Sequence, residues 1–282
     1  MVDPNERGIM GTDWFLKKGS SHKICEDYVI CGNDYCILSD GCSQSPFTDV
    51  GSRVLCMAAA GGINTLMKRG IIPGYEVFGM TVARQAASII RSMNLPKESL
   101  NATLIVAWKM GPMIHVFIYG DGHVYCDFEG EDGEVTKTLY SYEYGDPEKP
   151  ETNAPLYLSY WLEQKDLDTY RANYGHHNLT VKFNGNPKDK ETACKFDHLI
   201  FPSLWKNVVI FSDGIESFTK PGIEKLTQYE LVNELTSFKN YNGEFIRRRA
   251  NGAFRYYNKE GIIHTDDLSI AGLHNDFEKS ED

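Results

Sequence analysis

Carboxylate side chains stand at the ends of three apolar segments of the sequence. Asp40 and Asp213 each follow an apolar run with β-favouring residues, and the pair Asp266-Asp267 leads into a third such run. A carboxylate at the end of a buried strand is costly to desolvate unless a cation pairs with it. Several that converge on one place are typical of a site for a hard metal ion. The alternative is that each Asp-Gly pair is only a turn after a strand.

A predicted hairpin brings further acidic residues to Asp40. Residues 28–31 and 35–38 flank a Gly-Asn-Asp stretch with the composition of a turn. The start of the first strand, at Glu26 and Asp27, would then lie beside the end of the second strand at Asp40. Simple hairpin geometry thus predicts that acidic residues a dozen or so positions apart meet.

Two long amphipathic helices are predicted after the hairpin. The first covers residues 50–69 with Thr48 or Asp49 as its N-cap, and the second covers residues 75–93. Their apolar faces are expected to carry Val50, Val54, Met57, Ala58 and Leu66 in the first helix, and Val77, Met80, Ala83, Ala87 and Ile90 in the second.

An antiparallel meander is predicted next, because strand-like runs alternate with Gly-containing turns. Its strands are expected at 102–109, 113–119, 123–128 and 135–142, followed by short strands within 156–199, helices at 228–238 and 244–256, and a last strand after Asp266. This order of elements predicts an α+β sandwich with helices outside. We expect a single domain with a core at about residues 12–274 and flexible ends at 1–11 and 275–282.

Composition excludes several classes of protein. The 282 residues carry a formal net charge of -10, which argues against a nucleic-acid partner but leaves a phosphate substrate open, because bound divalent cations would reverse the local field. No apolar run approaches the ~20 residues that span a bilayer, so no membrane association is expected. The seven cysteines include no CxxC pair, which argues against a zinc knuckle and favours a reducing, cytoplasmic setting. The sequence does not define the oligomeric state.

Short motifs from about Gly19 to Leu273 resemble, in order, those of the PPM-type, metal-dependent protein phosphatase 2C family, with a bacterial-like pattern. The motifs are Cys25-Glu26-Asp27, Ser39-Asp40-Gly41, Ala102-Thr103-Leu104, Gly120-Asp121-Gly122-His123, Ser212-Asp213-Gly214-Ile215 and Asp266-Asp267-Leu268-Ser269. Each motif alone is common, whereas six in order are fairly specific. The resemblance implies two packed antiparallel β-sheets flanked by helices on both outer faces, with metals at one end of the seam.

The resemblance also implies a set of ligands for Mn²⁺ or Mg²⁺. Asp40 would bridge two ions, and Asp213 and Asp266 would complete the protein ligands of the first, so that Asp40 and Asp213 are the expected catalytic carboxylates. The Gly41 carbonyl would reach the second ion, and Glu26 would support that ion. The alternative to Asp266 as a ligand is Asp267.

Further acidic residues have implied supporting roles. Asp27 and Asp267 would orient metal waters. Asp121, with Asp213, would hold a third and weaker metal ion, as in bacterial members of the family; the alternative is that Asp121 belongs to an ordinary hairpin turn.

The phosphate side of the expected site departs from the family pattern. His22, next to Lys23, stands where the family carries an arginine that clamps the phosphate, and neither side chain replaces a bidentate guanidinium. Both remain candidates for phosphate binding; the alternative is an ordinary surface loop. Cys42 stands where eukaryotic members often place a histidine. The composition of residues 170–190 suggests a lineage-specific insertion.

Two functional hypotheses follow. The first is a metal-dependent phosphoprotein phosphatase that hydrolyses Ser/Thr phosphomonoesters in signalling, through a water activated between two metal ions. The chain has no Cys-x5-Arg loop for a cysteinyl-phosphate mechanism. The second is a catalytically weak family member that binds phosphorylated partners or regulates another protein. The triplet Arg247-Arg248-Arg249 is either a solvated helix face or a docking patch for an acidic partner.

Overall fold

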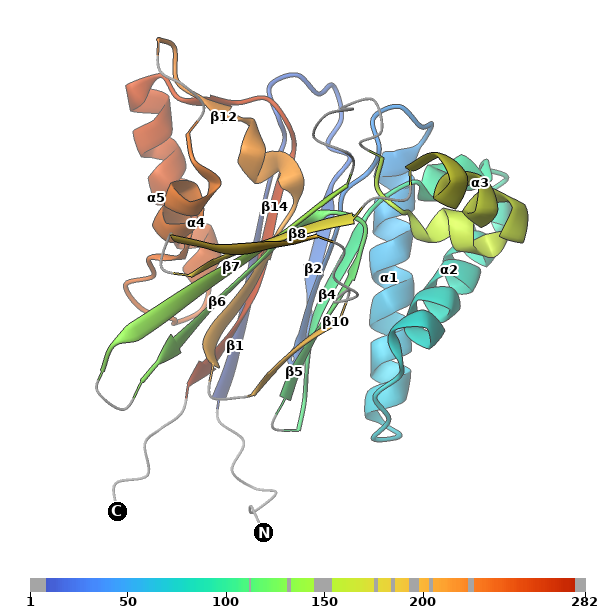
Figure 1. Ribbon diagram of the computed structural model, residues 1–282, viewed down its shortest axis with the longest axis horizontal. Coiled ribbons are helices and arrows are strands. Elements are labelled where there is room, and N and C mark those ends of the chain that lie inside the picture. Colours follow the sequence, from blue (N-terminus) through green and yellow to red (C-terminus); the bar gives the residue numbers. More distant parts are fainter. Residues whose placement is uncertain are drawn as a thin grey trace.

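The chain folds into two antiparallel sheets packed face to face, with helices on both outer faces (Figure 1). The computed structural model describes residues 9–111, 113–130, 133–144, 154–174, 177–183, 186–192, 198–202, 205–222 and 226–276. The predicted α+β sandwich is confirmed. None of the described helices combines the length and apolar character that crossing a membrane requires.

The two sheets differ in size. The larger has seven strands in the order β1 (Ile9–Lys17), β14 (Leu268–Asp276), β11 (Trp205–Phe211), β6 (Gly122–Glu129), β7 (Val135–Tyr144), β8 (His177–Phe183) and β9 (Asn186–Thr192). The smaller has five strands in the order β10 (His198–Pro202), β5 (Met113–Tyr119), β4 (Leu104–Met110), β3 (Tyr35–Ser39) and β2 (Tyr28–Cys31). A short pair joins β12 (Phe218–Thr219) to β13 (Ile263–His264).

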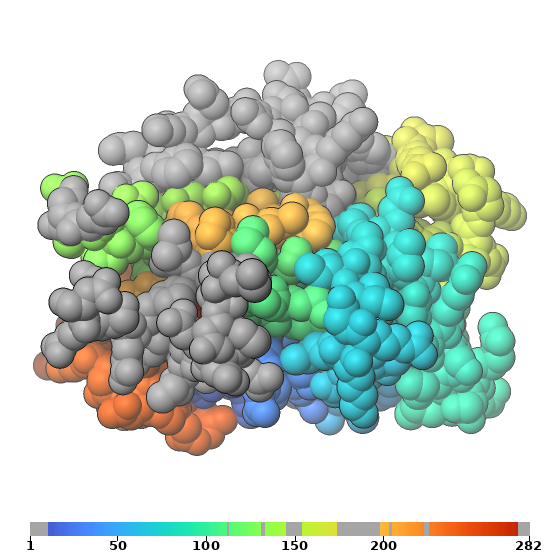
Figure 2. Space-filling view, turned by 90° about the horizontal axis from the view of Figure 1, so that it is seen from below, coloured from blue at the N-terminus to red at the C-terminus, as the bar shows by residue number. Residues whose placement is uncertain are grey.

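Helices cover both outer faces, and short 3-10 turns connect the elements. The helices are α1 (Thr48–Met67), α2 (Tyr75–Ser92), α3 (Gln164–Tyr174), α4 (Gln228–Thr236) and α5 (Phe245–Glu260). The 3-10 turns are η1 (Lys97–Leu100), η3 (Leu158–Leu162) and η4 (Asp213–Ser217). Seen from below, α5 and the α1–α2 pair stand at opposite ends of the molecule, with strand residues between them (Figure 2).

Three apolar clusters hold these layers together. Side chains such as Ile105, Val124 and Ile210 fill the space between the sheets. A second cluster, which includes Trp108, packs beneath α1 and α2, and a third, which includes Phe254, packs beneath α4 and α5. Each fully buried side chain of this size contributes roughly 1.5–3 kcal/mol. The double layer therefore gives its strand ends a rigid frame.

The hairpin predicted around Gly32 is confirmed. β2 and β3 pair in register from Tyr28 opposite Ser39 to Cys31 opposite Cys36. The predicted helices and the last strand are also present, with boundaries shifted by a few residues. The single-domain prediction stays untested, and its two expected ends lie largely outside the described residues.

The predicted single meander is wrong. β4 pairs with β5 and β6 pairs with β7, but β5 and β6 lie in different sheets. The Gly120–Gly122 turn therefore carries the chain from one sheet to the other. Gly122 has a φ of 127°, and a Cβ there would lie 2.8 Å from the Phe211 carbonyl oxygen, so this crossing needs glycine.

The predicted N-cap of the first helix is also wrong. Phe47, with a φ of 60°, is the N-cap residue and makes no side-chain cap. The Thr48 hydroxyl instead donates to Glu26 Oε1 at 3.2 Å. Two residues assigned to the apolar faces are exposed, Met57 by 63 % and Val77 by 65 %, because the sheet contacts a narrower stripe of each helix than the sequence pattern covers.

The prediction of short strands within residues 156–199 is partly correct. β8, β9 and β10 lie there, but the first part of the segment forms η3 and α3. α3 has few apolar residues, which left the sequence without a helical signal. The hypothesis of an insertion over residues 170–190 stays a prediction, and part of that segment lies outside the described residues.

Candidate metal centre

Strand ends bring the predicted acidic residues to one end of the sandwich. β2 and β3 are antiparallel neighbours, and so are β11 and β14. The start of one strand in each pair therefore lies beside the end of the other. This places Asp27 beside Asp40 in the smaller sheet, and Asp213 beside Asp267 in the larger one. Contacts between β3 and β14 across the seam join the two pairs.

Close backbone approach shapes the first of these ends. Gly41 forms an isolated bridge with Ala102, just after β3. A Cβ at this glycine would lie 2.8 Å from the Glu26 carbonyl oxygen and 2.9 Å from the Thr48 side chain. The Asp40 carbonyl accepts a hydrogen bond from the Thr103 amide at 2.8 Å. The carboxylate of Asp40 is thus carried by a backbone that is held from both sides.

The carboxyl groups of Asp27, Asp40, Asp121 and Asp213 crowd one another. Burial raises the pKa of Asp40 well above its usual range, and the charges of Asp27, Asp213 and Asp121 raise it further. Burial also raises the pKa of Asp27 to about 7, although Ser269 and Ser212 oppose that shift. Carboxylates that raise one another's pKa in this way disfavour their own ionisation until a cation joins them.

Asp121, in the turn that connects the two sheets, belongs to the same cluster. Burial raises the pKa of its carboxyl group, and Asp213, Glu216 and Glu143 add to the shift. Because the chain passes between sheets here, this residue is not part of a hairpin turn, which was the alternative explanation for it. Its neighbour His123 is fully buried and contacts Glu216 Oε1 at 3.1 Å.

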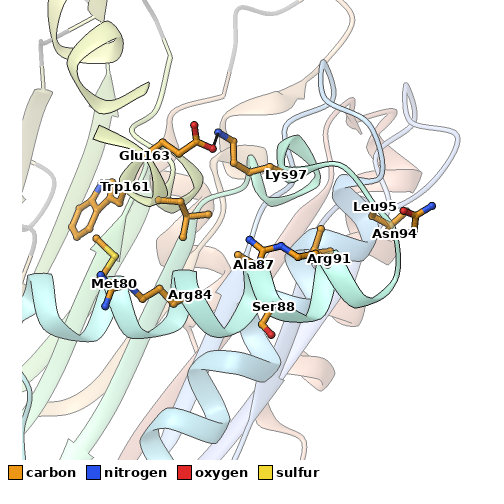
Figure 3. Close-up of a pocket in the computed structure, with 12 residues that line it drawn as sticks. Met80, Arg84, Ala87, Ser88, Arg91, Asn94, Leu95, Lys97, Trp161 and Glu163 are labelled. Atoms are coloured by element: carbon orange, nitrogen blue, oxygen red, sulfur yellow. Dashed lines mark hydrogen bonds and ion pairs between the residues drawn. The ribbon is translucent and has the colours of Figure 1, made fainter. Parts of the chain in front are cut away.

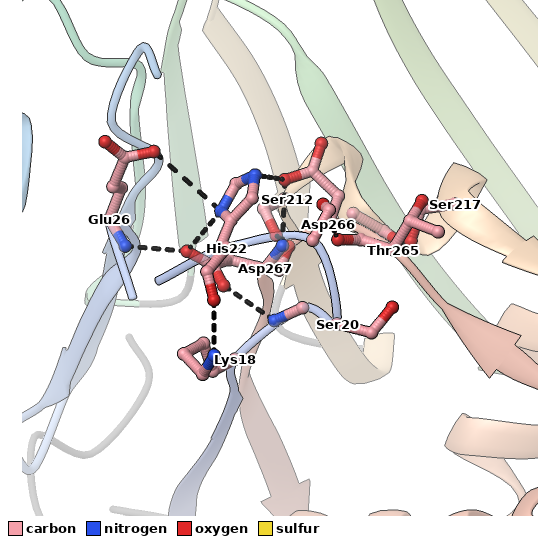
Figure 4. Close-up of polar contacts among 12 residues, drawn as sticks. Lys18, Ser20, His22, Glu26, Ser212, Ser217, Thr265, Asp266 and Asp267 are labelled. Atoms are coloured by element: carbon pink, nitrogen blue, oxygen red, sulfur yellow. Dashed lines mark hydrogen bonds and ion pairs between the residues drawn. The ribbon is translucent and has the colours of Figure 1, made fainter. Parts of the chain in front are cut away.

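His22 lies among the remaining predicted acids (Figure 4). Its Nδ1 is 3.0 Å from Asp267 Oδ2 and 3.8 Å from Glu26 Oε2, while its Nε2 is 3.3 Å from Asp266 Oδ1. Burial lowers the pKa of His22, but Asp267, followed by Asp266 and Glu26, raises it above its ordinary value overall. The acids around the imidazole therefore favour its protonated form. Lys23 is exposed on the same loop and forms no ion pair with a described residue.

Asp267 holds this loop in place. It is 1 % exposed, and its two oxygens accept hydrogen bonds from the Gly19 amide at 2.7 Å and the Glu26 amide at 2.6 Å. Asp266 is more accessible, with 42 % of its side chain exposed. Asp266 Oδ1 accepts a hydrogen bond from the Asp267 amide at 2.8 Å, so the oxygen of this pair that has no hydrogen-bond partner among the described residues is Asp266 Oδ2. Burial, followed by Asp213, raises the pKa of Asp266.

Tyr157 is a neighbour of the site that the sequence did not point to. Burial raises the pKa of its hydroxyl group, and Cys42, Asp121 and Asp40 raise it further, which places the ring beside the carboxylates. It comes from the Tyr-rich segment before η3, where no motif or periodicity distinguishes it. Only the packing of η3 against α2 brings it here.

The donor set fits hard divalent cations. Within the described residues, no three or more His, Cys, Asp or Glu side chains enclose a single point as they stand. However, Asp213 Oδ1 is buried without a hydrogen-bond partner among the described residues. The donors at the strand ends are carboxylate oxygens, which select Mn²⁺ or Mg²⁺ over softer metals. A cation would offset their mutual repulsion.

Comparisons with known proteins match this fold and three of its acidic motifs. The family model for protein phosphatase 2C matches residues 19–145, which include the motifs at Glu26, Asp40 and Asp121. The predicted resemblance to the PPM-type protein phosphatase 2C family is thereby confirmed. No curated protein sequence matches the chain.

Solved structures of serine/threonine phosphatases share the fold at low sequence identity. PstP/Ppp of Mycobacterium tuberculosis is 14 % identical, with 95 % of this chain and 99 % of that chain covered and a TM-score of 0.52. Stp1 of Staphylococcus aureus is 11 % identical, with 98 % and 100 % covered and a TM-score of 0.53. The PstP catalytic domain in complex with two manganese ions is 14 % identical, with 94 % and 97 % covered and a TM-score of 0.51.

Proposed function

We propose that the protein is a metal-dependent protein phosphatase that hydrolyses Ser/Thr phosphomonoesters of phosphoproteins. The observation that carries this proposal is the crowding of Asp27, Asp40, Asp121 and Asp213 at one end of the sandwich, where burial and neighbouring acids raise the pKa values of Asp27, Asp40 and Asp121. A chain that only bound phosphorylated partners would gain nothing from this repulsion. The family match, and the two manganese ions in the PstP catalytic domain, point the same way.

The proposed roles of the ligands are those that the family resemblance implies. Asp40 is the proposed bridge between two Mn²⁺ or Mg²⁺ ions, and Asp213 and Asp266 complete the ligands of the first ion. The Gly41 carbonyl and Glu26 serve the second ion. Asp213 Oδ1 is buried and without a hydrogen-bond partner in the described chain, as are both carboxylate oxygens of Asp27, so a nearby metal ion would stabilise these atoms.

Three acids have supporting roles in the proposal. Asp121 holds a weaker third ion together with Asp213. Asp27 lies within the cluster and orients its water molecules. Asp267 acts mainly by holding the loop that carries Glu26 and His22, since both of its oxygens already accept backbone hydrogen bonds.

The reaction needs no covalent nucleophile on the protein. Two divalent ions, when bound, would lower the pKa of a water molecule for in-line attack on phosphorus and offset charge on the phosphoryl oxygens. His22, held by Asp267 and Asp266 with a raised pKa, presents a cation to the phosphate in place of the family's arginine. The buried Tyr157 lies beside Cys42 and the carboxylates of Asp40 and Asp121.

Other properties of the chain support a phosphoprotein substrate. The net charge of -10 disfavours a nucleic-acid substrate. The six cysteines in the described parts of the chain are free thiols, which is consistent with the expected reducing, cytoplasmic setting. We propose a role in phosphorylation-dependent signalling on these grounds.

Hydrolysis of p-nitrophenyl phosphate tests the proposal. We expect turnover that requires Mn²⁺ or Mg²⁺ and stops with a chelator. Asp213→Asn is expected to lower turnover by at least about a hundredfold while the fold, followed by circular dichroism, is retained. The matched control is Asp168→Asn, which removes an exposed charge on α3. Folded protein without turnover in either metal would instead favour a phosphoprotein-binding or regulatory role, and wild-type turnover in Asp213→Asn would refute the metal assignment.

A further inference from the structure

A groove runs along the exposed side of α2, lined by residues outside the acidic cluster (Figure 3). It has a volume of about 610 Å³. Its floor is the face of α2 that carries Arg84 and Arg91, and its opposite wall consists of Lys97 in η1 and of the end of η3 with Glu163. Nothing in the family motifs falls on this surface.

The groove carries positive charge that the protein itself does not neutralise. Arg84 and Arg91 are exposed, and neither forms an ion pair with a described residue. The cation of the opposite wall, Lys97, is already neutralised, because it contacts Glu163 at 3.0 Å and also contacts Asp166. Two unpaired guanidinium groups in a groove of a chain with net charge -10 favour an acidic ligand.

The arginines of α5 show the opposite situation. Arg247 contacts Glu244, Arg248 donates to the Asn240 side chain at 2.7 Å, and Arg249 donates to the Glu234 carbonyl. Arg248 thus holds the loop before α5 onto the helix, and Arg249 joins α5 to α4. The triplet is thus occupied within the protein, whereas the arginines of α2 are available.

An apolar wall completes the groove. Met80, Trp161 and Leu162 line it, and Trp161 packs edge-on against Tyr75 and Tyr119 with ring centroids 5.8 Å apart in both cases. The indole ring is therefore held in one orientation. Rigid aromatic side chains beside arginines are typical of residues that dominate binding energy at protein interfaces.

We propose that this groove binds an extended acidic segment of the protein's phosphoprotein substrate, an inference that rests on the function proposed above. Arg84 and Arg91 are two helical turns apart, roughly 10 Å along the axis. An extended peptide in the polyproline II conformation rises about 3.1 Å per residue with three residues per turn, so acidic groups three positions apart would face the same side and meet both guanidinium groups. An apolar side chain between them would lie over Ala87, which stands between the two arginines on α2. Met80 and Trp161 would contact the peptide beyond Arg84.

Two segments that line the groove continue toward the metal centre. The segment that ends at Trp161 begins at Tyr157, beside Asp40 and Asp121. The second segment is η1, which leads directly into Asn101. The side-chain amide of Asn101 donates a hydrogen bond at 2.9 Å to Ser45, in the loop after Asp40. A substrate held in the groove would therefore be tethered close to the carboxylates, which raises the effective concentration of its phosphoresidue.

Fluorescence anisotropy of a labelled peptide tests the groove without any metal. The probe is a short peptide with two glutamates three positions apart and a leucine between them, and its control carries lysines in place of the glutamates. We expect the acidic peptide to bind chelator-treated protein and the lysine peptide not to bind. The double variant Arg84→Glu/Arg91→Glu should weaken binding by about tenfold or more, because two attractions become repulsions.

Matched controls keep the result interpretable. Arg255→Glu makes the same charge change on the exposed face of α5 and should leave peptide affinity unchanged. The double variant should hydrolyse p-nitrophenyl phosphate at the wild-type rate, since this small substrate does not reach the groove. It should lose efficiency, as kcat/KM, only on a phosphopeptide that carries the acidic segment.

Several outcomes would overturn the proposal. Equal affinity of wild-type and double-variant protein for the acidic peptide would exclude the groove as its site. Loss of self-association in the double variant, measured by sedimentation without a change in peptide affinity, would assign the groove to a second copy of the chain. Binding of phosphatidylserine vesicles in place of the peptide would assign it to a lipid surface. Failure of the proposed function would appear separately, as absent p-nitrophenyl phosphate turnover with peptide binding intact.

Discussion

The acidic centre and the α2 groove are both charged, but their charges differ in burial and therefore in their effect on stability. The carboxylates of Asp27, Asp40 and Asp213 come from distant segments and are driven together at the end of the sandwich, where burial raises the pKa values of Asp27 and Asp40. The guanidinium groups of Arg84 and Arg91 come from one helix and remain in water. Only the first arrangement lowers the stability of the metal-free protein.

This difference sets what each region says about function. Buried like charges are destabilising, so their presence at the strand ends points to a cation that binds there. Exposed arginines on a helix cost little in folding and are by themselves weak evidence for a ligand. In the groove, two further features indicate a ligand. Trp161 and an apolar wall lie beside the arginines, and neither arginine has an ion pair within the described chain.

The largest expected effect is stabilisation by Mn²⁺, which should depend on the acidic centre and not on the groove. Mn²⁺ at a hundred times its dissociation constant should stabilise the wild-type protein by about 2.7 kcal/mol. Asp40→Asn should lose this stabilisation and, without metal, unfold at a higher temperature than wild type, because one of the repelling charges is gone. Differential scanning fluorimetry with and without Mn²⁺ measures both effects. Asp168→Asn and Arg84→Glu are the controls and should keep the Mn²⁺-dependent rise in unfolding temperature. The same rise in Asp40→Asn as in wild type would contradict the assignment of the metal to the acidic centre.

A smaller effect is expected in the pH dependence of stability. The folded-state pKa of Asp27 is raised to about 7, so the folded protein keeps a proton that the unfolded chain releases at lower pH. The stability this carboxyl group contributes is present at acidic pH and is lost as pH rises toward about 7. Urea unfolding of chelator-treated protein should therefore show a decline over this window that Asp27→Asn removes. A decline of the same size in Asp27→Asn would mean that another group is responsible.

The smallest effect compares the arginines of α5 with those of α2. Arg248→Ala should lower the free energy of unfolding by about 1 kcal/mol, because its hydrogen bonds to Asn240 and Asn242 are lost. Arg84→Ala should change stability by less than about 0.5 kcal/mol. The effects on the acidic peptide should be reversed, with weaker binding only for Arg84→Ala. If Arg248→Ala also weakened peptide binding, the distinction between occupied and available arginines would fail.

Much of the centre could be predicted because it depends on short-range geometry. The β2–β3 hairpin needs only its turn and two β-favouring runs, and it brings Asp27 beside Asp40 wherever the hairpin packs. The acids at Asp213 and Asp267 are likewise positioned by the strands that they adjoin. Helices and strands with clear apolar periodicity were predicted for the same reason, since the pattern reflects which face is buried.

Other features depended on packing that no local pattern encodes. The turn at Gly120–Gly122 has a hairpin composition, yet the two sheets separate there, because β5 pairs with β10 and β6 with β11. Thr48 was expected to cap a helix and instead donates to Glu26, which only the docking of α1 against the hairpin makes possible.

The sequence by itself determined that acids stand at the ends of apolar strands and that these strands build an α+β sandwich, because strand periodicity and turn composition are local properties. The tertiary structure alone decided that His22 turns toward Asp266 and Asp267, and that Tyr157 lies beside the carboxylates. It also decided that Arg84 and Arg91 line a groove. These contacts join segments far apart in the chain, and the free energy that selects them comes from burial against other elements.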